Sequence, residues 1–287
     1  MSNEYRTLIS AADLMAHLND PNWVIVDARF ALADFTLGRR KYLDLHIPGA
    51  VFADLNLDLA APHIPGATGR HPLPSVEQAA AVFARLGISH GVQVVAYDDA
   101  GGALAAGRVW WMLRWLGHNQ VAVLDGGWQA WQPAGYPVRS GEETNPQGVF
   151  VPHPRPGLLV TTAQVDAMRH DPAYLVIDAR AHERYLGQNE TIDPVAGHIP
   201  GAISAPYLHN LAPDGRFLPV DELCRRYEGL LAGIPVENTA TYCGSGVTSI
   251  HNLLAMQHAG FGEGGLYVGS WSEWIVDRTR PVATGEA

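Results

Sequence analysis

One cysteine in this sequence stands where a reactive thiol would be expected. Cys243 is one of only two cysteines in a chain of 287 residues, and the mostly small residues Gly-Ser-Gly-Val-Thr-Ser separate it from a helical pattern. Backbone N–H groups in such a turn can point inward, and with the N-terminus of the next helix they form a pocket that favours an anion. That environment lowers the pKa of a thiol, so Cys243 is predicted to be a nucleophile. The other cysteine, Cys224, lies in an amphipathic helical pattern and is interpreted as structural.

Two kinds of cysteine chemistry use a loop of this type. Hydrolysis of phosphate esters by a Cys-x5-Arg loop needs an arginine to hold the phosphoryl group, but the corresponding position is Ser249. Sulfur transfer, in which the cysteine carries a sulfane sulfur as a persulfide, needs only N–H donors around the sulfur anion. We therefore favour sulfur transfer, with the persulfide and substrate held by the loop residues Gly244, Ser245, Gly246, Val247 and Thr248.

The two halves of the chain repeat one pattern. Each half has an apolar run ending in Asp-Ala-Arg, at 23–29 and 174–180, followed by His-Ile-Pro-Gly-Ala and, near its end, a Trp-x-x-Trp pair. The same features in the same order at a nearly constant offset indicate a tandem duplication. Aligning the halves places Asp98 where Cys243 stands, so the first half lacks the nucleophile and is expected to be non-catalytic.

The elements that position Cys243 follow from the alternation of short β-branched runs with helical patterns. This alternation predicts an α/β fold with two domains, each a mainly parallel sheet with helices on both faces. The expected boundaries are 1–139 for the first domain, 140–157 for a linker rich in Pro and Gly, and 158–287 for the catalytic domain. Sites in such sheets form beyond the carboxyl ends of strands, and Cys243 directly follows the strand-like Thr-Ala-Thr-Tyr.

Helix starts and core positions can also be predicted locally. Ser10 and Thr162 precede helical patterns and are expected to be N-caps, and Ser75 with Gln78 has the spacing of a capping box. The tryptophans of the stretch 108–116 recur at helical spacing, so we expect them in the core.

Composition and charge exclude several classes of function. Lys plus Arg number 19 and Asp plus Glu 29, and the formal net charge of −10 argues against a nucleic-acid partner. No apolar run approaches the ~18 residues of a membrane span, and the N-terminal residues lack the apolar segment of a signal peptide. With two cysteines and no disulfide framework, we expect a cytoplasmic protein that does not bind a membrane. Zinc-ligand and dinucleotide motifs are missing, so we expect neither a metal nor a cofactor.

Together these motifs resemble the two-domain sulfurtransferases of the rhodanese and 3-mercaptopyruvate sulfurtransferase family across essentially the whole chain. The resemblance implies tandem rhodanese-like domains of which only the second is catalytic. It also implies a small-molecule sulfur donor and, as acceptor, thioredoxin, a small thiol or cyanide.

The loop after the cysteine distinguishes branches of that family. Members that prefer thiosulfate carry charged residues there, whereas Cys-Gly-Ser-Gly-Val-Thr is similar to members that prefer 3-mercaptopyruvate. The expected reaction is therefore transfer of sulfur from 3-mercaptopyruvate through a Cys243 persulfide, with release of pyruvate. A thiosulfate:cyanide sulfurtransferase is one alternative, and a non-catalytic sulfur-carrying or interaction module is another.

The resemblance also implies roles for particular side chains. Arg184 matches the family's substrate-binding arginine and would hold a carboxylate. Arg180 stands at the end of the strand, and from that position we interpret it as forming a structural ion pair, either with Asp178 or with the neighbouring domain. Ser245 and His46 match a serine and a histidine with an acid–base role, and Ser245 would stabilise the negative charge that develops on the substrate.

One position departs from the family pattern. Mercaptopyruvate enzymes carry a second arginine where this chain has Asp193. Either another arginine substitutes for it, with Arg70 and Arg108 as the candidates, or the carboxylate of the donor is held more weakly.

Overall fold

The computed structural model describes residues 4–286, which form two compact units. The first unit runs to Ala61 and adds Leu73–Arg155 and Pro213–Phe217. The second unit contains Pro62–Pro72, Pro156–Ala212 and the chain from Leu218 onward. The short segment Pro62–Pro72 therefore belongs to the unit that carries Cys243, although it lies in the first half of the sequence.

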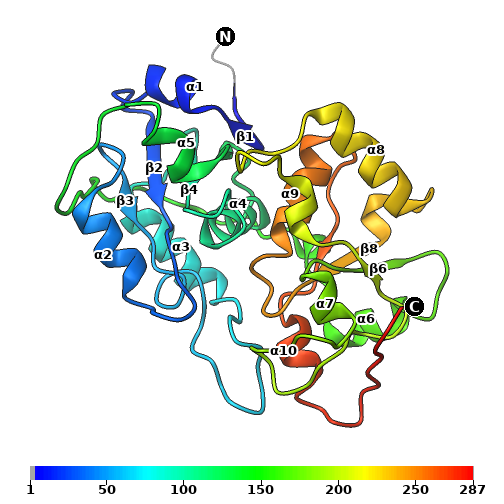
Figure 1. The fold of residues 1–287 in the computed structure, drawn as a ribbon. Helices are drawn as coiled ribbons and strands as arrows, with labels where there is room; N and C mark the ends of the chain where they lie inside the picture. The colour runs from blue at the N-terminus through cyan, green and yellow to red at the C-terminus, as the bar shows by residue number, and fades with distance from the viewer. Residues whose placement is uncertain (1–3, 287) are drawn as a thin grey trace. The chain divides into compact units, whose positions relative to one another are not determined.

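The first unit is built on a five-stranded parallel sheet in the order β1-β5-β4-β2-β3 (Figure 1). Its strands are rich in valine and isoleucine and buried on both faces, as expected for parallel strands connected by helices. The elements of this unit are β1 (Leu8–Ile9), α1 (Ala11–Ala16), β2 (Trp23–Asp27), α2 (Leu37–Asp44), β3 (Val51–Phe52), α3 (Val76–Arg85), β4 (Gln93–Tyr97), α4 (Ala105–Trp115), β5 (Val121–Leu124) and α5 (Gly127–Trp131).

Both faces of this sheet are covered by helices, which confirms the predicted architecture. On one face Tyr97 of β4 packs in a core with Leu14 of α1 and Trp131 of α5. Because successive side chains of a strand alternate, Val94 and Ala96 point to the opposite face, where α4 contacts the strand. The tryptophans of α4 are buried, as their spacing predicts.

The second unit repeats the arrangement with a four-stranded parallel sheet in the order β7-β6-β8-β9 (Figure 1). A bridge from Leu159 to Leu266 adds a short parallel pairing beside β9. The elements are η1 (Pro156–Leu158), α6 (Thr162–Met168), β6 (Leu175–Asp178), α7 (His182–Tyr185), β7 (Ile203–Ser204), η2 (Tyr207–Asn210), α8 (Val220–Leu231), η3 (Val236–Asn238), β8 (Thr239–Tyr242), α9 (Ile250–His258), β9 (Gly265–Leu266) and α10 (Ser270–Trp274).

The core of the second unit matches that of the first. Tyr242 of β8 packs with Val165 of α6 and Trp274 of α10 on one face of the sheet. On the other face α9 lies against β8, and α8 packs on α9. The sheet therefore fixes both the end of β8 and the start of α9, which flank the Cys243 loop.

The predicted helix starts are confirmed in two of three cases. The Ser10 side chain accepts the N–H of Asp13, and Ser75 with Gln78 forms a complete capping box. The prediction of Thr162 is wrong by one residue, because Thr161 is the N-cap and forms a capping box with Gln164. Two adjacent threonines satisfy the same composition rule, and only the spacing to the glutamine selects between them.

The segment predicted to be a linker is bound to the first unit up to Arg155. Gly148 N–H donates to the Ala84 carbonyl at 2.8 Å, and His153 N–H donates to Leu116 at 2.8 Å. These bonds bring additional N–H donors to carbonyl groups at the C-terminal ends of α3 and α4. The segment thus serves as a cap for two helices.

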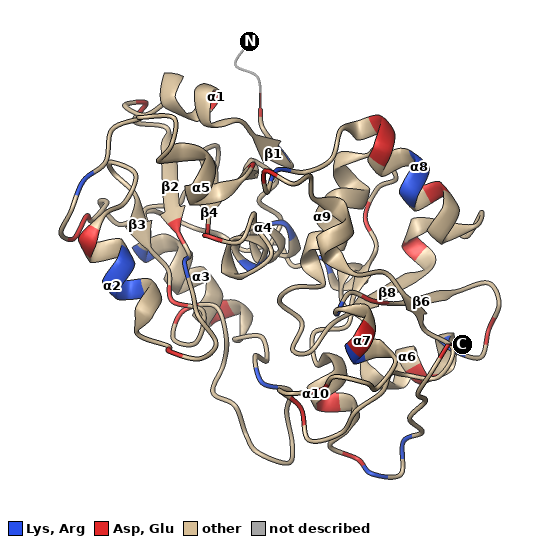
Figure 2. Ribbon diagram, in the orientation of Figure 1, with Lys and Arg blue, Asp and Glu red and all other residues tan. Residues whose placement is uncertain are grey.

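Charged residues are dispersed over both units. Figure 2 shows a basic stretch with an acidic end on α2 and alternating acidic and basic positions along α8. Within residues 4–286, no helix is long and apolar enough to span a bilayer.

Candidate active site

Cys243 directly follows β8, at the carboxyl end of a parallel strand, and is 3% exposed. Its backbone is fixed on both sides by α10. The Cys243 N–H donates to Ser270 Oγ at 3.1 Å, and its carbonyl accepts the N–H of Trp271 at 3.0 Å. Ser270 has a φ of 55°, a left-handed conformation that its counterpart Gly127 in the first unit also adopts. A serine here accepts the strained backbone and supplies an acceptor for Cys243.

Backbone N–H groups surround the sulfur. Burial is the largest single influence on the Cys243 pKa and raises it, whereas hydrogen bonds from the backbone N–H groups of Ser245, Ser249 and Val247 lower it. The Ser249 hydroxyl, buried and without a hydrogen bond of standard geometry, also lowers the Cys243 pKa. The net pKa lies below the ordinary value of 9.0. The loop therefore stabilises a thiolate, and α9 adds the positive end of its dipole.

The two loop glycines have different surroundings. Gly246 has a φ of +71°, and a Cβ there would lie well under 3.0 Å from the carbonyl oxygen of Val268. A Cβ on Gly244 would lie 2.7 Å from Nη2 of Arg70, so this guanidinium group lies beside the residue next to Cys243. Thr248 is partly exposed, and its carbonyl accepts the N–H of His251.

The first unit contains the same loop with a carboxylate in place of the thiol. Asp98 follows β4 as Cys243 follows β8, and it is wholly buried. Burial raises the Asp98 pKa, and four backbone N–H groups oppose that rise at 2.9 to 3.2 Å. The four donors are Ala100, Gly102, Leu104 and Ala106. The same loop thus surrounds a buried carboxyl group in the first unit and a buried thiol in the second.

Ser245 is joined to a histidine that the sequence reasoning missed. His71 Nδ1 lies 2.8 Å from Ser245 Oγ, and both residues are buried. With a proton on Nδ1, His71 donates to Ser245 and leaves the hydroxyl proton free to point at a substrate. His71 lies in the segment Pro62–Pro72, and no local pattern shows that this segment joins the second unit.

His46, the histidine expected to act with Ser245, is enclosed in the first unit. Its Nδ1 lies 2.7 Å from the Tyr42 carbonyl, and its backbone pairs with Arg139 in both directions. Its counterpart His198 makes the matching contact, with Nδ1 2.8 Å from the Tyr185 carbonyl. A histidine with the same contacts in both halves fixes the turn at which it stands, and the histidine that lies against Ser245 is His71.

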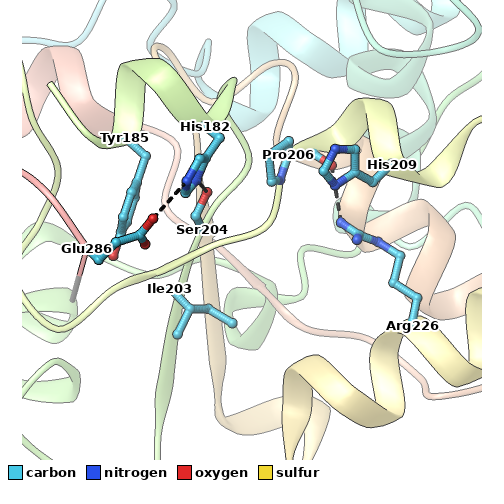
Figure 3. A pocket seen from close by; sticks show the side chains of 8 residues that line it. All are labelled: His182, Tyr185, Ile203, Ser204, Pro206, His209, Arg226 and Glu286. Atoms are coloured by element: carbon cyan, nitrogen blue, oxygen red, sulfur yellow. Dashed lines mark hydrogen bonds and ion pairs between the residues drawn. The ribbon is translucent and has the colours of Figure 1, made fainter. Parts of the chain in front are cut away.

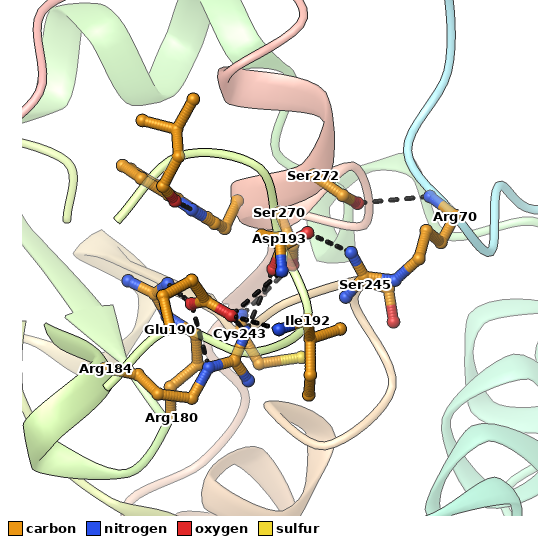
Figure 4. A network of polar contacts seen from close by, with 12 residues as sticks. Arg70, Arg180, Arg184, Glu190, Ile192, Asp193, Cys243, Ser245, Ser270 and Ser272 are labelled. Carbon is orange, nitrogen blue, oxygen red and sulfur yellow. Dashed lines mark hydrogen bonds and ion pairs between the residues drawn. The ribbon is translucent and has the colours of Figure 1, made fainter. Parts of the chain in front are cut away.

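An ion-pair network lies beside the Cys243 loop (Figure 4). Arg184 donates from Nε and Nη2 to Glu190, both at 2.9 Å, and from Nη2 to Oδ2 of Asp193 at 2.9 Å. Arg70 donates from Nη1 to Oδ1 of the same Asp193. The carboxylate at position 193 therefore joins two guanidinium groups, one on α7 and one on the segment Pro62–Pro72.

The two candidate substitutes for a second arginine have different places. Arg70 is in the network beside Gly244, whereas Arg108 lies on α4 of the first unit and is 0% exposed. Arg70 is thus the candidate that the structure places next to the Cys243 loop.

Arg180 forms the structural ion pair expected of it. Its Nη2 donates to Asp178 at 2.6 Å and to the Gly197 carbonyl at 2.7 Å. Burial lowers the Arg180 pKa. The charges of Asp178 and Glu190 and the hydrogen bonds to Asp178 raise the pKa by more than burial lowers it, so the guanidinium stays charged. The prediction of a pair with Asp178 is confirmed.

A separate pocket of about 430 Å³ lies in the second unit (Figure 3). In it His182 Nδ1 lies 2.9 Å from Ser204 Oγ, and Nε2 lies 3.2 Å from Glu286. The Glu286 side chain is 76% exposed, so its charge is screened by solvent. The lining described for this pocket does not include the Cys243 loop, and we assign it no part in the sulfur chemistry.

Cys224 lies on α8 with its Sγ 3.3 Å from the Ala259 carbonyl, and both cysteines are free thiols. Among residues 4–286, no cluster of three or more His, Cys, Asp or Glu side chains has the arrangement to hold a metal ion.

Comparison with known proteins identifies the family. The rhodanese-like domain model matches residues 10–134 and 161–277. A relative from Pseudomonas aeruginosa, named a probable 3-mercaptopyruvate sulfurtransferase, is 49% identical over 280 residues, which cover 97% of this chain and 98% of the relative. A Mycobacterium tuberculosis relative, named the putative thiosulfate sulfurtransferase SseB, is 40% identical over 292 residues and 98% of each chain.

The fold comparison agrees. The solved 3-mercaptopyruvate sulfurtransferase from Leishmania major matches with a TM-score of 0.84 at 29% identity, over 96% of this chain and 76% of that one. The chain therefore belongs to the rhodanese-like family of sulfurtransferases, with one rhodanese-like match in each half.

Proposed function

We propose that this protein transfers the sulfur of 3-mercaptopyruvate to a thiol or cyanide acceptor through a persulfide on Cys243. The observation that carries the proposal is a low-pKa thiol in an uncharged loop, with the Arg184 and Arg70 guanidinium groups beside it. 3-Mercaptopyruvate has one carboxylate, remote from its sulfur. The N–H groups of the loop suit the sulfur, and the guanidinium groups suit the carboxylate.

The first half-reaction forms the persulfide. The Cys243 thiolate attacks the donor sulfur, an S–S bond forms, and the C–S bond breaks. The electron pair of that bond passes to the carbon fragment, which becomes the enolate of pyruvate and takes up a proton at carbon. The outer sulfur stays on Cys243, where the N–H groups of Ser245, Val247 and Ser249 stabilise the persulfide anion.

The enolate oxygen is the group whose charge grows during this step. We place Ser245 as its hydrogen-bond donor, because its hydroxyl lies two residues from the nucleophile and is held by His71. A donor positioned before the reaction stabilises developing charge without reorganisation, an effect worth about 10²-fold or more in rate for similar donors. His71 orients the hydroxyl and can replace the proton that it gives up.

The second half-reaction returns the enzyme to its starting form. The acceptor is cyanide or the thiolate of either thioredoxin or a small thiol. It attacks the outer sulfur, and Cys243 leaves as a thiolate. Donor and acceptor thus react in turn at one sulfur, which is ping-pong covalent catalysis. A reducing compartment such as the cytoplasm suits this cycle, because it keeps thiol acceptors reduced and both cysteines free.

Mass spectrometry with two matched cysteine variants tests the proposal. The wild-type protein and Cys224→Ser are incubated with 3-mercaptopyruvate, and each is expected to release pyruvate and to gain one sulfur atom on the Cys243 peptide. Cys243→Ser is expected to do neither while keeping the same melting temperature. Pyruvate release by Cys243→Ser, or no sulfur on Cys243 in the wild-type protein, would refute the proposal.

A further inference from the structure

We infer that Arg70 is a second anchor for the donor carboxylate and that Asp193 is the residue that positions it. The inference deepens the proposed function, on which it rests for the identity of the donor. It starts from Asp193, an acidic residue at the position where a second arginine would be expected to bind the donor carboxylate. Asp193 supplies no cation itself, but it holds one that comes from a distant part of the sequence.

The arrangement of charge and exposure in the network supports this role. The Asp193 side chain is 1% exposed, whereas those of Arg70 and Arg184 are 24% and 17% exposed. The carboxylate thus lies behind two guanidinium groups that reach solvent. Two guanidinium groups this close would repel each other, and an acid bound to both offsets that repulsion. Each arginine uses one nitrogen on Asp193 and has further N–H groups for a ligand.

One N–H of Arg70 lacks a hydrogen-bond partner within the protein. Its Nε is buried and makes no hydrogen bond. Leaving a buried donor unpaired is destabilising. A ligand carboxylate that accepted from this group would remove the cost. The unpaired donor therefore points to a ligand at the Arg70 guanidinium independently of the ion pair with Asp193.

The backbone of Arg70 is fixed so that its side chain must lie at the loop. Its N–H donates to Ser272 Oγ at 3.1 Å, which ties the segment Pro62–Pro72 to α10. Its Nη2 lies 2.7 Å from the position that a Cβ on Gly244 would take. The next residue, His71, bonds to Ser245. One short segment therefore brings a cation and an acid–base group to two consecutive residues of the loop.

Cys243, the Ser245–His71 pair and the two arginines offer one partner for each functional group of the donor. In 3-mercaptopyruvate the sulfur, the carbonyl and the carboxylate follow one another along a three-carbon chain. Cys243 faces the sulfur, Ser245 with His71 serves the carbonyl, and Arg70 with Arg184 takes the carboxylate. If Asp193 instead competed with the donor for both arginines, removing the Asp193 carboxylate would strengthen binding of the donor carboxylate.

A pair of alkylating reagents tests the anchor without requiring sulfur transfer. Bromopyruvate has the skeleton of 3-mercaptopyruvate with bromine in place of the thiol, and bromoacetone lacks only the carboxylate. With either reagent the Cys243 thiolate forms a C–S bond and bromide leaves. The ratio of the two alkylation rates at Cys243 therefore measures how well the site holds a carboxylate.

The variants are Arg70→Gln, Asp193→Asn and the double variant, with the exposed Arg225→Gln on α8 as the matched control. We expect each single variant to lower the ratio by about tenfold or more, because a charge-assisted pair contributes about 1.5–3 kcal/mol. The double variant should lie close to the singles, since both remove the same anchor. Arg225→Gln should leave the ratio unchanged.

Two results would overturn the inference: an unchanged ratio in Arg70→Gln, or a higher ratio in Asp193→Asn. Arg70→Lys distinguishes loss of the anchor from a folding defect. It keeps a cation for Asp193, so it should retain part of the selectivity for the carboxylate. The bromoacetone rate serves as an internal measure that the thiolate is intact. If the wild-type protein forms no persulfide from 3-mercaptopyruvate, the proposed function fails, while the ratio still decides whether Arg70 and Asp193 form a carboxylate anchor.

Discussion

Replacing Gly246 by alanine tests the loop on which the chemistry depends. Gly246 has a φ of +71°, and a Cβ there would meet the Val268 carbonyl at far less than 3.0 Å. The left-handed backbone costs a non-glycine residue about 1–2 kcal/mol. Removing the overlap requires a backbone shift of about 1.5 Å, given ordinary contact distances of about 3.5–4.0 Å. That shift displaces the adjacent N–H groups of Ser245 and Val247, which point at the Cys243 sulfur.

The size of the effect follows from the lost hydrogen bonds. A hydrogen bond to a charged group contributes about 1.5–3 kcal/mol, and one pKa unit corresponds to about 1.36 kcal/mol. Loss of one N–H donor should therefore raise the Cys243 pKa by about one to two units. The thiolate is the reactive form, so its reaction at neutral pH should slow by about tenfold or more.

The pH dependence of alkylation by iodoacetamide measures this pKa directly. In the wild-type protein the alkylation rate should rise with pH and then level off. The midpoint of the rise should lie below pH 9.0, because the net effect of the loop is to lower the Cys243 pKa. In Gly246→Ala the midpoint should move up, and the rate at high pH should recover, since a thiolate of higher pKa is intrinsically more nucleophilic. An unchanged midpoint in a folded Gly246→Ala protein would refute the account of the loop.

Four further predictions concern single residues. Ser249→Ala should raise the Cys243 pKa by about one unit or less, because it removes a hydroxyl that lowers that pKa but makes no standard hydrogen bond, and the midpoint of the alkylation profile checks it. Gly229→Ala should increase the free energy of unfolding by about 0.5–1 kcal/mol in urea titrations, because Gly229 is exposed within α8 with nothing near its Cβ position. His71→Asn should lower kcat for 3-mercaptopyruvate by about 10²-fold or more with the bromoacetone rate unchanged. His46→Asn should instead reduce stability and spare the kcat of the folded fraction, and the opposite pattern would return the acid–base role to His46.

The parts of the fold that were predicted correctly depend on local patterns. The alternation of β-branched runs with helical stretches specifies parallel sheets, and the repeated Asp-Ala-Arg motif marks equivalent strands in both units. The ion pair of Arg180 with Asp178 spans two residues, so it can be foreseen from the sequence. Cys243 at a glycine-rich turn after a strand is another local signal, because the turn itself supplies the N–H groups.

The contacts that were missed join segments far apart in the chain. His46 belongs to a conspicuous motif, but that motif recurs at His198 with the same backbone contacts, which marks it as part of the fold. His71 has no motif, and its position depends on where Pro62–Pro72 packs. In the sequence, Asp193 stands where a second arginine was expected, so a cation is missing there. In the structure Asp193 pairs with both Arg70 and Arg184, and only the folded chain shows that Arg70 brings a cation to this place.

The central claim is that an uncharged loop with arginines beside it selects 3-mercaptopyruvate. The most direct test compares kcat/KM for 3-mercaptopyruvate and for thiosulfate, with the same acceptor at saturating concentration. The account predicts a preference for 3-mercaptopyruvate of about a hundredfold or more, which corresponds to about 2.7 kcal/mol of transition-state stabilisation. Equal values, or a preference for thiosulfate, would contradict the assignment of the donor.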